Sequence, residues 1–438
     1  MKKLLVALIL AIFPASQVMS IERIDITNGN IEPMPIASLK FFSLDSFNKE
    51  VGKEISEVIN NDLKGTGLFR LISEAAYNDS ISSIKDRPSF IAWRQINASA
   101  LIVGEVFNVG SGRIKVEYKL WDPYTETILV SGYFESKYNE WRRIAHKIAD
   151  EIYKRITGEE GYFDTKILFI AASGPGKYRI KRLAIMDQDG VNLKYLNDGK
   201  SLTLTPRFSP DNRKALYLSF AKKKPRVHYR DLNTGDDHIL GHFKGMTFAP
   251  RFSPDGKEVA MSSALNGSSD VYLMDIEAKK PKQLTRGAYI NTSPYFSPDG
   301  EKIVFVSDRS GTAQLYIMNK DGSDQQRISF GKGRYYTPIW SPRGDYIAFT
   351  KTSSGTFYIG VMRPDGSGER MLTQGYLVES PAWSPNGRQI IYTRGEPYRG
   401  DGKAAKSYLC TIDITGHFER TLNLPTDASD PSWSNLLK

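Results

Sequence analysis

The sequence predicts a multidomain protein in which an N-terminal α/β domain is followed by an all-β six-bladed propeller closed by a C-terminal strand. Three observations predict this fold class. A proline-containing phrase recurs at steps of 43 to 50 residues, helical and strand patterns mix upstream of it, and the chain ends on a strand that the repeat region needs. The predicted parts are a signal peptide at 1–20, the α/β domain at 21–160 and the propeller at 161–438.

The composition is that of an ordinary globular protein. The chain has 438 residues, with 59 Lys+Arg against 49 Asp+Glu and a formal net charge of +10. Its single cysteine excludes an intrachain disulfide framework, a cysteine zinc site and a C-x-x-C redox pair. The basic balance is compatible with nucleic acid, an acidic membrane surface or an acidic protein partner, and it does not choose among them.

The first twenty residues are typical of a secretory signal. Lys2 and Lys3 precede an apolar run, Leu4 to Phe13, and Val18-Met19-Ser20 suits a signal-peptidase site. The apolar run is well short of the roughly 20 residues that a membrane-spanning helix needs. We therefore expect a cleaved leader, a mature chain that starts near Ile21, and export to a bacterial periplasm.

The segment before the repeats combines two amphipathic helices with strands. Apolar residues recur at helical spacing along 47–63 and 141–156, and each pattern is soon followed by a glycine. Strand patterns occupy 100–106 and 113–121. We interpret both helical stripes as core faces packed on a small sheet, and place a short linker at 157–165.

The repeated phrase reads P-x-[FW]-S-P-x-[GN] in five copies, and a sixth copy is cut off. Its first proline stands at residues 206, 250, 294, 338, 381 and 431. Steps of 44, 44, 44, 43 and 50 residues match a four-stranded propeller blade rather than a helical solenoid. In Ser297-Pro298-Asp299-Gly300 the proline presets φ, the aspartate can bond its own backbone and the glycine takes a positive φ, so each phrase predicts a tight turn.

An apolar second strand follows each of these turns. Second strands are predicted at 215–220, 258–263, 302–307, 346–351 and 389–394. A third strand of alternating character and a short fourth strand complete each repeat.

The two ends of the repeat region complement each other. Residues 430–434 form a first strand with no chain left for three more, whereas 166–173, 181–187 and 192–197 form three strands without a first. Together they predict a sixth blade that closes the ring and removes open sheet edges.

Sequence motifs of catalysis do not occur. There is no G-x-S-x-G, no G-x-G-x-x-G and no P-loop. His238 and His242 are interpreted as unrelated surface residues, and Asp187 and Asp189 lack the downstream glutamate of a calcium loop. Cys410 is expected to be a buried small hydrophobe. We predict no catalytic residue, cofactor or metal site, and no nucleic-acid partner, because aromatic residues do not interleave with the basic runs.

The domain order, the five repeats, the closing "DPSWS" and the junction "HKIADEIYKRITGEEGYFDTKI" at 146–167 together resemble the TolB family, the periplasmic propellers of the bacterial Tol-Pal envelope system. The resemblance covers essentially the whole chain. It implies a non-enzymatic adaptor that binds the lipoprotein Pal at the propeller canal and TolA through the extreme N-terminus. It also implies roles in outer-membrane integrity, in outer-membrane invagination during cell division and in bacteriocin import.

The resemblance also implies further partners and an oligomeric state. Other outer-membrane lipoproteins and bacteriocins are further expected partners. We expect a monomer that meets the membrane only through its partners.

Residues just before each repeat proline are predicted at the crossing from a fourth strand to the next first strand, on the canal rim. In the family, Pal-contacting positions resemble Ala249 and Thr292, and many members carry histidine where this chain has Met246. The alternative for each rim residue is a role in the turn alone. The candidate Pal site consists of Met246, Ala249, Thr292, Ser293, Tyr336 and Thr337.

The candidate TolA site lies in the N-terminal segment 21–33. Two isoleucines alternate there with charges ahead of an Asn-Gly turn, as in a short strand that could add to a sheet edge of a partner. The alternative is the first strand of the α/β domain. The candidate residues are Ile21, Glu22, Arg23, Ile24, Asp25 and Ile26.

A rival interpretation is a propeller hydrolase or a small-ligand-binding protein that uses the central canal as its pocket. Such a site needs convergent carboxylates or histidines. The rim has twelve positions, two before each of the six repeat prolines, and Glu379 and Asp430 are the acidic residues among them.

Overall fold

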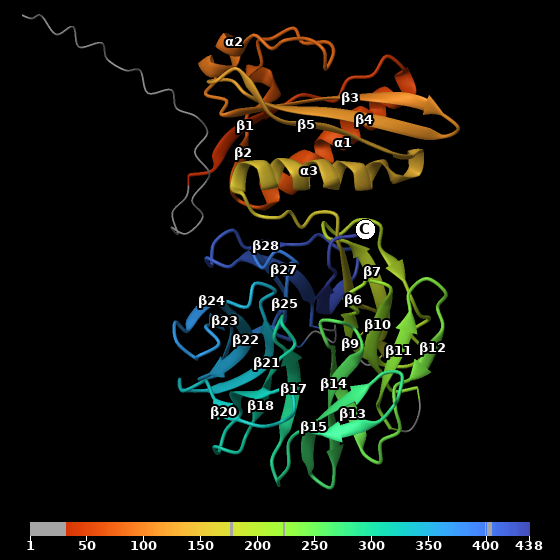
Figure 1. Ribbon diagram of the computed structural model, residues 1–438, viewed down its shortest axis with the longest axis vertical. Helices are drawn as coiled ribbons and strands as arrows, with labels where there is room; N and C mark the ends of the chain where they lie inside the picture. The colour runs from red at the N-terminus through yellow and green to blue at the C-terminus, as the bar shows by residue number, and fades with distance from the viewer. Residues whose placement is uncertain (1–31, 176–177, 222–223, 399, 401–404) are drawn as a thin grey trace, which may run out of the picture. The chain divides into compact units, whose positions relative to one another are not determined.

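A computed structural model describes residues 32–438, except 176–177, 222–223, 399 and 401–404, and divides them between two compact units (Figure 1). The predicted signal peptide lies outside the described residues. None of the helices in the described ranges is long and apolar enough to cross a membrane. The first unit is Met1–Asn60, Leu68–Ala145 and Arg155–Gly158, and the second is Asn61–Gly67, His146–Lys154 and Glu159–Lys438.

The first unit contains a five-stranded mixed sheet with strand order β2-β1-β3-β4-β5. β1 pairs in parallel with both β2 and β3, and β3, β4 and β5 form an antiparallel meander. The strands are β1 (Met34–Ser38), β2 (Phe69–Leu71), β3 (Ala100–Gly110), β4 (Arg113–Asp122) and β5 (Thr127–Lys137). The helices are α1 (Ser46–Gly65), η1 (Glu74–Ala76), α2 (Phe90–Gln95), η2 (Tyr138–Glu140) and α3 (Trp141–Thr157).

Both predicted amphipathic helices are confirmed as α1 and α3. The predicted stripe of α1 is buried, as at Val51, Ile55 and Ile59, while the side chain of Phe47 lies outside the described part of the chain. Gly52 shows how closely α1 approaches the segment between β1 and α1, since a Cβ atom there would lie 2.3 Å from the backbone oxygen of Phe41. Apolar spacing of 3.6 residues therefore sets the buried face of each helix.

The second unit contains six four-stranded antiparallel sheets, which are the blades of the propeller (Figure 1). The first two blades are β9 (Thr203–Phe208), β10 (Lys214–Ser219), β11 (Arg226–Asp231), β12 (Asp237–Ile239), and β13 (Met246–Phe252), β14 (Glu258–Leu265), β15 (Ser268–Asp275), β16 (Pro281–Gln283). The next two are β17 (Asn291–Phe296), β18 (Lys302–Ser307), β19 (Gln314–Asn319), β20 (Gln326–Arg327), and β21 (Arg334–Trp340), β22 (Ile347–Ser353), β23 (Thr356–Met362), β24 (Arg370–Gly375). The fifth is β25 (Leu377–Trp383), β26 (Gln389–Gly395), β27 (Ser407–Asp413), β28 (Arg420–Thr421), and the sixth joins β29 (Asp427–Trp433) to β6 (Lys166–Ser173), β7 (Ile180–Asp187) and β8 (Lys194–Tyr195).

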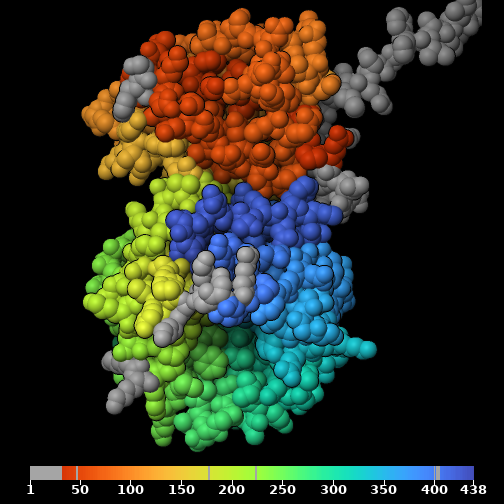
Figure 2. All heavy atoms as spheres, turned by 180° about the vertical axis from the view of Figure 1, so that it is seen from behind, coloured from red at the N-terminus to blue at the C-terminus, as the bar shows by residue number. Residues whose placement is uncertain are grey.

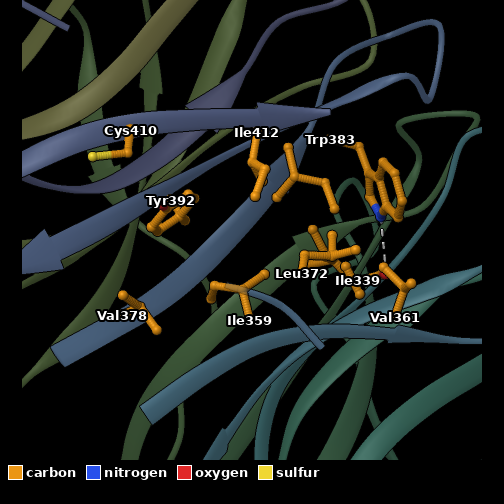
Figure 3. Packing of buried hydrophobic residues seen from close by; sticks show 11 residues of the cluster. Ile339, Ile359, Val361, Leu372, Val378, Trp383, Tyr392, Cys410 and Ile412 are labelled. Carbon is orange, nitrogen blue, oxygen red and sulfur yellow. Dashed lines mark hydrogen bonds between the residues drawn. The ribbon is translucent and has the colours of Figure 1, made fainter. Parts of the chain in front are cut away.

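Apolar side chains of neighbouring blades pack together and hold the blades side by side. Figure 3 shows the cluster between the fourth and fifth blades, in which Ile339 and Ile359 meet Tyr392 and Trp383. The Trp383 indole donates a hydrogen bond of 3.2 Å to the Ile339 carbonyl, so its polar atom is satisfied inside the cluster. Cys410 is 1% exposed in the same cluster, which confirms its predicted burial.

The predicted closure of the ring is confirmed. β29 pairs antiparallel with β6, with Asp427 opposite Ala172 and Trp433 opposite Ile167. The Trp433 indole donates a 2.8 Å hydrogen bond to the Thr165 hydroxyl. In Figure 2 the blue end of the chain lies against the yellow-green segment that begins the propeller. The sixth blade is therefore built from strands about 260 residues apart.

Asn212 departs from the repeat, and its contacts explain why. It occupies the turn position that is glycine in the next four copies, and its φ is 61°, which asparagine tolerates better than most residues. Its side-chain amide donates to the Asn435 carbonyl at 2.9 Å, and its side-chain oxygen accepts the Asn435 backbone N–H at 2.9 Å. The first blade therefore holds the residues that follow the closing strand.

Truncation of residues 429–438 should abolish cooperative unfolding of the propeller. The deletion removes most of β29 and exposes the paired edge of β6, so the ring loses its closing sheet contact. Differential scanning calorimetry of the full and truncated chains measures the effect. A truncated chain that melts in the same cooperative transition as the full chain would contradict the role of closure.

Replacement of Asn212 by glycine should lower the free energy of unfolding by about 1 kcal/mol, because glycine keeps the turn geometry but loses the side-chain hydrogen bonds to Asn435. Urea unfolding measures the change. The Asn435→Ala substitution leaves these backbone contacts and removes a different hydrogen bond, from the Asn435 amide to the Pro210 carbonyl at 2.8 Å, so comparison of the two variants isolates the contribution of Asn212. Equal stability of Asn212→Gly and the unaltered chain would show that the contacts contribute nothing.

Candidate functional site

The two ends of the propeller differ in which connections they carry. Each first strand begins at one end and runs to its Ser-Pro turn at the other. Connections from second to third strands and from fourth to the next first strands therefore meet at one end, which we call the loop end. The Ser-Pro turns and the connections from third to fourth strands meet at the opposite, turn end.

Exposed apolar side chains gather at the loop end. In the described part of the propeller, Val191 and Tyr195 are the large exposed apolar residues that lie elsewhere. Phe330 is 71% exposed and Tyr376 is 60% exposed, in two adjacent connections. The loop-end set is Tyr178, Ile180, Leu202, Phe220, Met246, Leu265, Tyr289, Ile290, Phe330, Tyr376 and Tyr398. Apolar side chains concentrated at one end of a ring are typical of a protein-binding surface.

The candidate Pal residues lie in three consecutive first strands at this end. Met246 is the first residue of β13, 43% exposed, and Ala249 follows in the same strand. Thr292 and Ser293 lie in β17. Tyr336 and Thr337 lie in β21 and line an open cavity of about 710 Å³, which Glu379 of β25 also lines.

The sequence-based placement of these residues at a strand crossing is wrong. The structure places the two residues before each repeat proline inside the first strand, where each first strand has a β-bulge. One residue of every bulge has a positive φ between 43° and 54°. These residues are Thr205, Ala249, Ser293, Thr337, Ser380 and Asp430.

Recurrence in all six blades identifies the bulge as part of the architecture. An extra residue bends a strand and increases its twist, and here it sits where each first strand borders the canal. In two blades, the backbone N–H of the bulge residue donates to a hydroxyl on the second strand of the preceding blade. Ser293 donates to the Ser262 hydroxyl at 3.2 Å, and Asp430 donates to the Thr393 hydroxyl at 3.0 Å. The left-handed backbone at these positions is therefore part of the fold of every blade. The blades differ instead in the exposed side chains around the bulge.

The two acidic rim residues have different environments. Burial raises the pKa of Glu379, and the nearby negative charge of Asp430 raises it further. The Asp430 carboxylate accepts hydrogen bonds from the Ser380 hydroxyl at 3.3 Å and the Ser429 hydroxyl at 3.1 Å. Asp430 is thus fixed by the bulges of two neighbouring first strands.

The structure brings together a histidine and two aspartates that sequence reasoning did not connect. One possible ligand atom each from His146, Asp187 and Asp189 lies within 4.8 Å of the others. However, Asp187 accepts hydrogen bonds from the Lys166 ammonium at 2.7 Å and from the Asn192 amide at 2.6 Å. Burial opposes ionisation of Asp187, but Lys166 lowers its pKa overall. An ammonium beside the carboxylate already supplies the positive charge that a cation would bring.

His146 also forms a hydrogen bond with a third aspartate, Asp62. Its Nδ1 lies 2.6 Å from Asp62 Oδ2, and the Gln188 amide donates to Asp62 Oδ1 at 2.8 Å. These buried groups therefore form a hydrogen-bonded network within the second unit. The six candidate TolA residues, Ile21 to Ile26, lie outside the described residues.

Comparison with known proteins agrees with this architecture. Residues 153–437 match the family model of the TolB beta propeller domain, and residues 22–129 match that of the TolB amino-terminal domain. The Tol-Pal system protein TolB of Paramagnetospirillum magneticum is 61% identical over 417 residues, which cover 95% of this chain and 93% of the relative. The Tol-Pal system protein TolB of Rickettsia prowazekii is 51% identical over 427 residues, covering 95% of this chain and 96% of the relative.

A solved structure supports the same assignment. The crystal structure of TolB from Acinetobacter baumannii is similar with a TM-score of 0.81 and 25% identity, and the match covers 92% of this chain and 97% of that chain. With both family models and these relatives spanning nearly its whole length, the chain belongs to the TolB family.

Proposed function

We propose that this protein is a non-enzymatic periplasmic adaptor of the Tol-Pal system, which binds Pal at the loop end of the propeller and TolA through its N-terminal segment. The observation that carries the Pal site is the concentration of exposed apolar side chains at the loop end. Membership in a family whose relatives are named Tol-Pal system proteins supports the biological setting.

The loop end has the composition of a protein-binding surface. Aromatic side chains dominate the binding energy of most interfaces when they enter pockets of a partner. Phe330, Tyr376 and Tyr289 provide such groups on three connections. The open cavity of about 710 Å³ beside Tyr336 and Thr337 could in turn receive a side chain of the partner.

Thr292 lies among short side chains on this surface. Its hydroxyl accepts a hydrogen bond from the Ser262 hydroxyl at 3.3 Å, and the Ser293 hydroxyl lies 3.4 Å away. Small groups at the bulge leave room for a partner to approach the backbone of β17. Met246, at the start of the neighbouring first strand, adds an exposed apolar side chain. The family resemblance implies histidine at this position in many members, so we expect Met246 to lack the polar contact with Pal that a histidine would make.

The proposed cellular role follows from bridging two partners. A protein that binds both the lipoprotein Pal and TolA connects the outer membrane to the inner-membrane part of the system. We assign it to the maintenance of outer-membrane integrity and to outer-membrane invagination during division. The same surfaces offer a route for bacteriocins during import. A cleaved leader at 1–20 would deliver the chain to the periplasm.

Replacement of Thr292 by tryptophan should abolish capture of Pal in a pull-down. The indole would fill the space above the bulge and prevent close approach, which corresponds to a loss of about 2 kcal/mol or more in binding free energy. Thr292→Ser keeps the hydroxyl and should bind normally. Lys257→Trp places the same bulk at the exposed turn end and should also bind normally.

Thermal melting of each variant separates misfolding from lost binding. If Thr292→Trp does not fold, Phe330→Asp tests the same surface at an exposed connection. Unchanged Pal capture by a folded Thr292→Trp or Phe330→Asp protein would contradict the proposed site.

A chain that starts at Met34 should lose binding to TolA and keep binding to Pal. The deletion removes the segment 21–33 but leaves β1 intact, so the sheet of the first unit is retained. Surface-immobilised TolA and Pal measure the two interactions separately against a chain that starts at Ile21. TolA binding that survives the deletion would place the TolA site elsewhere on the protein.

A further inference from the structure

One position of the repeat brings two arginines to a cavity that residues of all six blades line. It lies directly after the first proline of each phrase, two residues beyond the bulge position, and we call it the canal waist. The six waist residues are Arg207, Arg251, Tyr295, Ile339, Ala382 and Ser432. Four of them, Arg207, Arg251, Tyr295 and Ser432, line the cavity, whereas Ile339 packs in the cluster between the fourth and fifth blades. The two arginines come from the neighbouring strands β9 and β13, so their positive charges lie on one side of the ring.

Both guanidinium groups are buried, with Arg207 9% exposed and Arg251 8% exposed. Their hydrogen bonds go to backbone oxygens. Arg207 donates to the Pro206 carbonyl at 2.6 Å and to the Pro431 carbonyl at 3.5 Å, and Arg251 donates to the Pro250 carbonyl at 2.9 Å.

The buried Nε of Arg251 has no hydrogen-bond partner among the described residues. In the same part of the chain, neither arginine forms an ion pair with a carboxylate within 4 Å. These two side chains therefore bring buried positive charge into the canal without direct compensation.

Such an arrangement is electrostatically costly. Burial lowers the pKa of Arg251, and the neighbouring charge of Arg207 lowers it further. A guanidinium nevertheless stays protonated in proteins, so the cost persists as stored electrostatic repulsion. Asp430 attracts both arginines without forming an ion pair with either of them. Its carboxylate oxygens accept hydrogen bonds from Ser380 and Ser429 instead.

The space beside the arginines suits a small ligand. A cavity of about 300 Å³ is lined by Arg207, Arg251, Tyr295 and Ser432. The Arg251 guanidinium also lies 5.4 Å from the centre of the Tyr295 ring, which fixes its position. A volume of this size admits an ion as large as phosphate with some water.

We infer that the canal waist is a binding site for a small oxyanion, held between Arg207 and Arg251. Guanidinium groups present N–H donors in a planar fork that matches two oxygen atoms of one anion. An anion in the cavity compensates the positive charge of the pair and offers acceptor oxygens to the two guanidinium groups. The site lies deeper in the canal than the loop-end residues proposed to contact Pal, and its existence does not depend on that proposal.

Titration of the protein from Ile21 onward with inorganic phosphate tests the inference. The buffer is sodium HEPES, a background salt of a bulky organic anion is adjusted to keep the ionic strength constant as phosphate is added, and isothermal calorimetry and thermal melting are the readouts. We expect saturable binding with one phosphate per chain and a melting temperature that rises with phosphate. Arg251→Met should weaken the phosphate affinity by about tenfold or more, because one charged donor fork is lost.

Matched variants separate the site from general charge effects. Arg286→Met removes an exposed arginine of the same propeller and should leave phosphate binding unchanged. If Arg251→Met does not fold, Arg207→Met and Arg251→Lys carry the test, since an ammonium keeps the charge but lacks the fork. The inference is overturned if phosphate shows no saturable binding, if a folded waist variant binds it as tightly as the unaltered chain, or if Arg286→Met weakens binding equally.

Discussion

Backbone pairing between β29 and β6 is the interaction on which the rest of the propeller depends. It joins Trp433 to Ile167 across almost the whole length of the second unit and closes a row of four-stranded sheets into a ring, in which the short outer strands remain as sheet edges. Each first strand can border a common canal only if the ring is closed, so the bulges and the waist keep their positions through this pairing. Since forming it requires a very long loop to close, packing between successive blades must supply most of the driving force before the ends meet.

The turns depart from the repeat sequence where a turn side chain also contacts a segment before or after the ring of blades. Asn212 keeps the positive φ that glycine supplies elsewhere and adds hydrogen bonds to the residues after the closing strand. In the fourth and fifth copies, Arg343 replaces the usual aspartate and pairs with Glu159 at 3.0 Å, and Asn386 donates to the Glu160 carbonyl at 2.8 Å. Side chains at these turns therefore secure the two chain segments that enter and leave the ring, while the turn geometry itself is unchanged.

Regular features of the fold could be predicted from sequence, since each has a local cause. Period and turn chemistry located the blades, and helical spacing located α1 and α3. The bulges could not be predicted, because threonine, alanine, serine and aspartate occupy the positive φ positions instead of glycine. The network of His146 with Asp62 and Gln188 could not be predicted either, since its members are far apart in the sequence. The positions of Arg207 and Arg251 were visible in the repeat, but their burial without a carboxylate partner depends on packing around the canal.

The repeat explains how one ring can carry several kinds of surface. Residues at one position of the phrase occupy the same place in each blade, and we call such a set a layer. A change at one position in one blade therefore alters a single sector of a single layer. The bulge layer has a fixed backbone and includes Asp430, the waist includes two arginines, and the loop end is apolar. Exposed side chains at the loop end do not set the turns, so substitutions there change charge and shape with little effect on the fold, whereas the bulges and Ile339 of the waist are part of the fold itself. Asp430 lies two residues before the waist position of its own strand, and its charge attracts both arginines. The positive charge of the arginines favours an anion at the waist, whereas the carboxylates of Asp430 and Glu379 disfavour an anion at the rim.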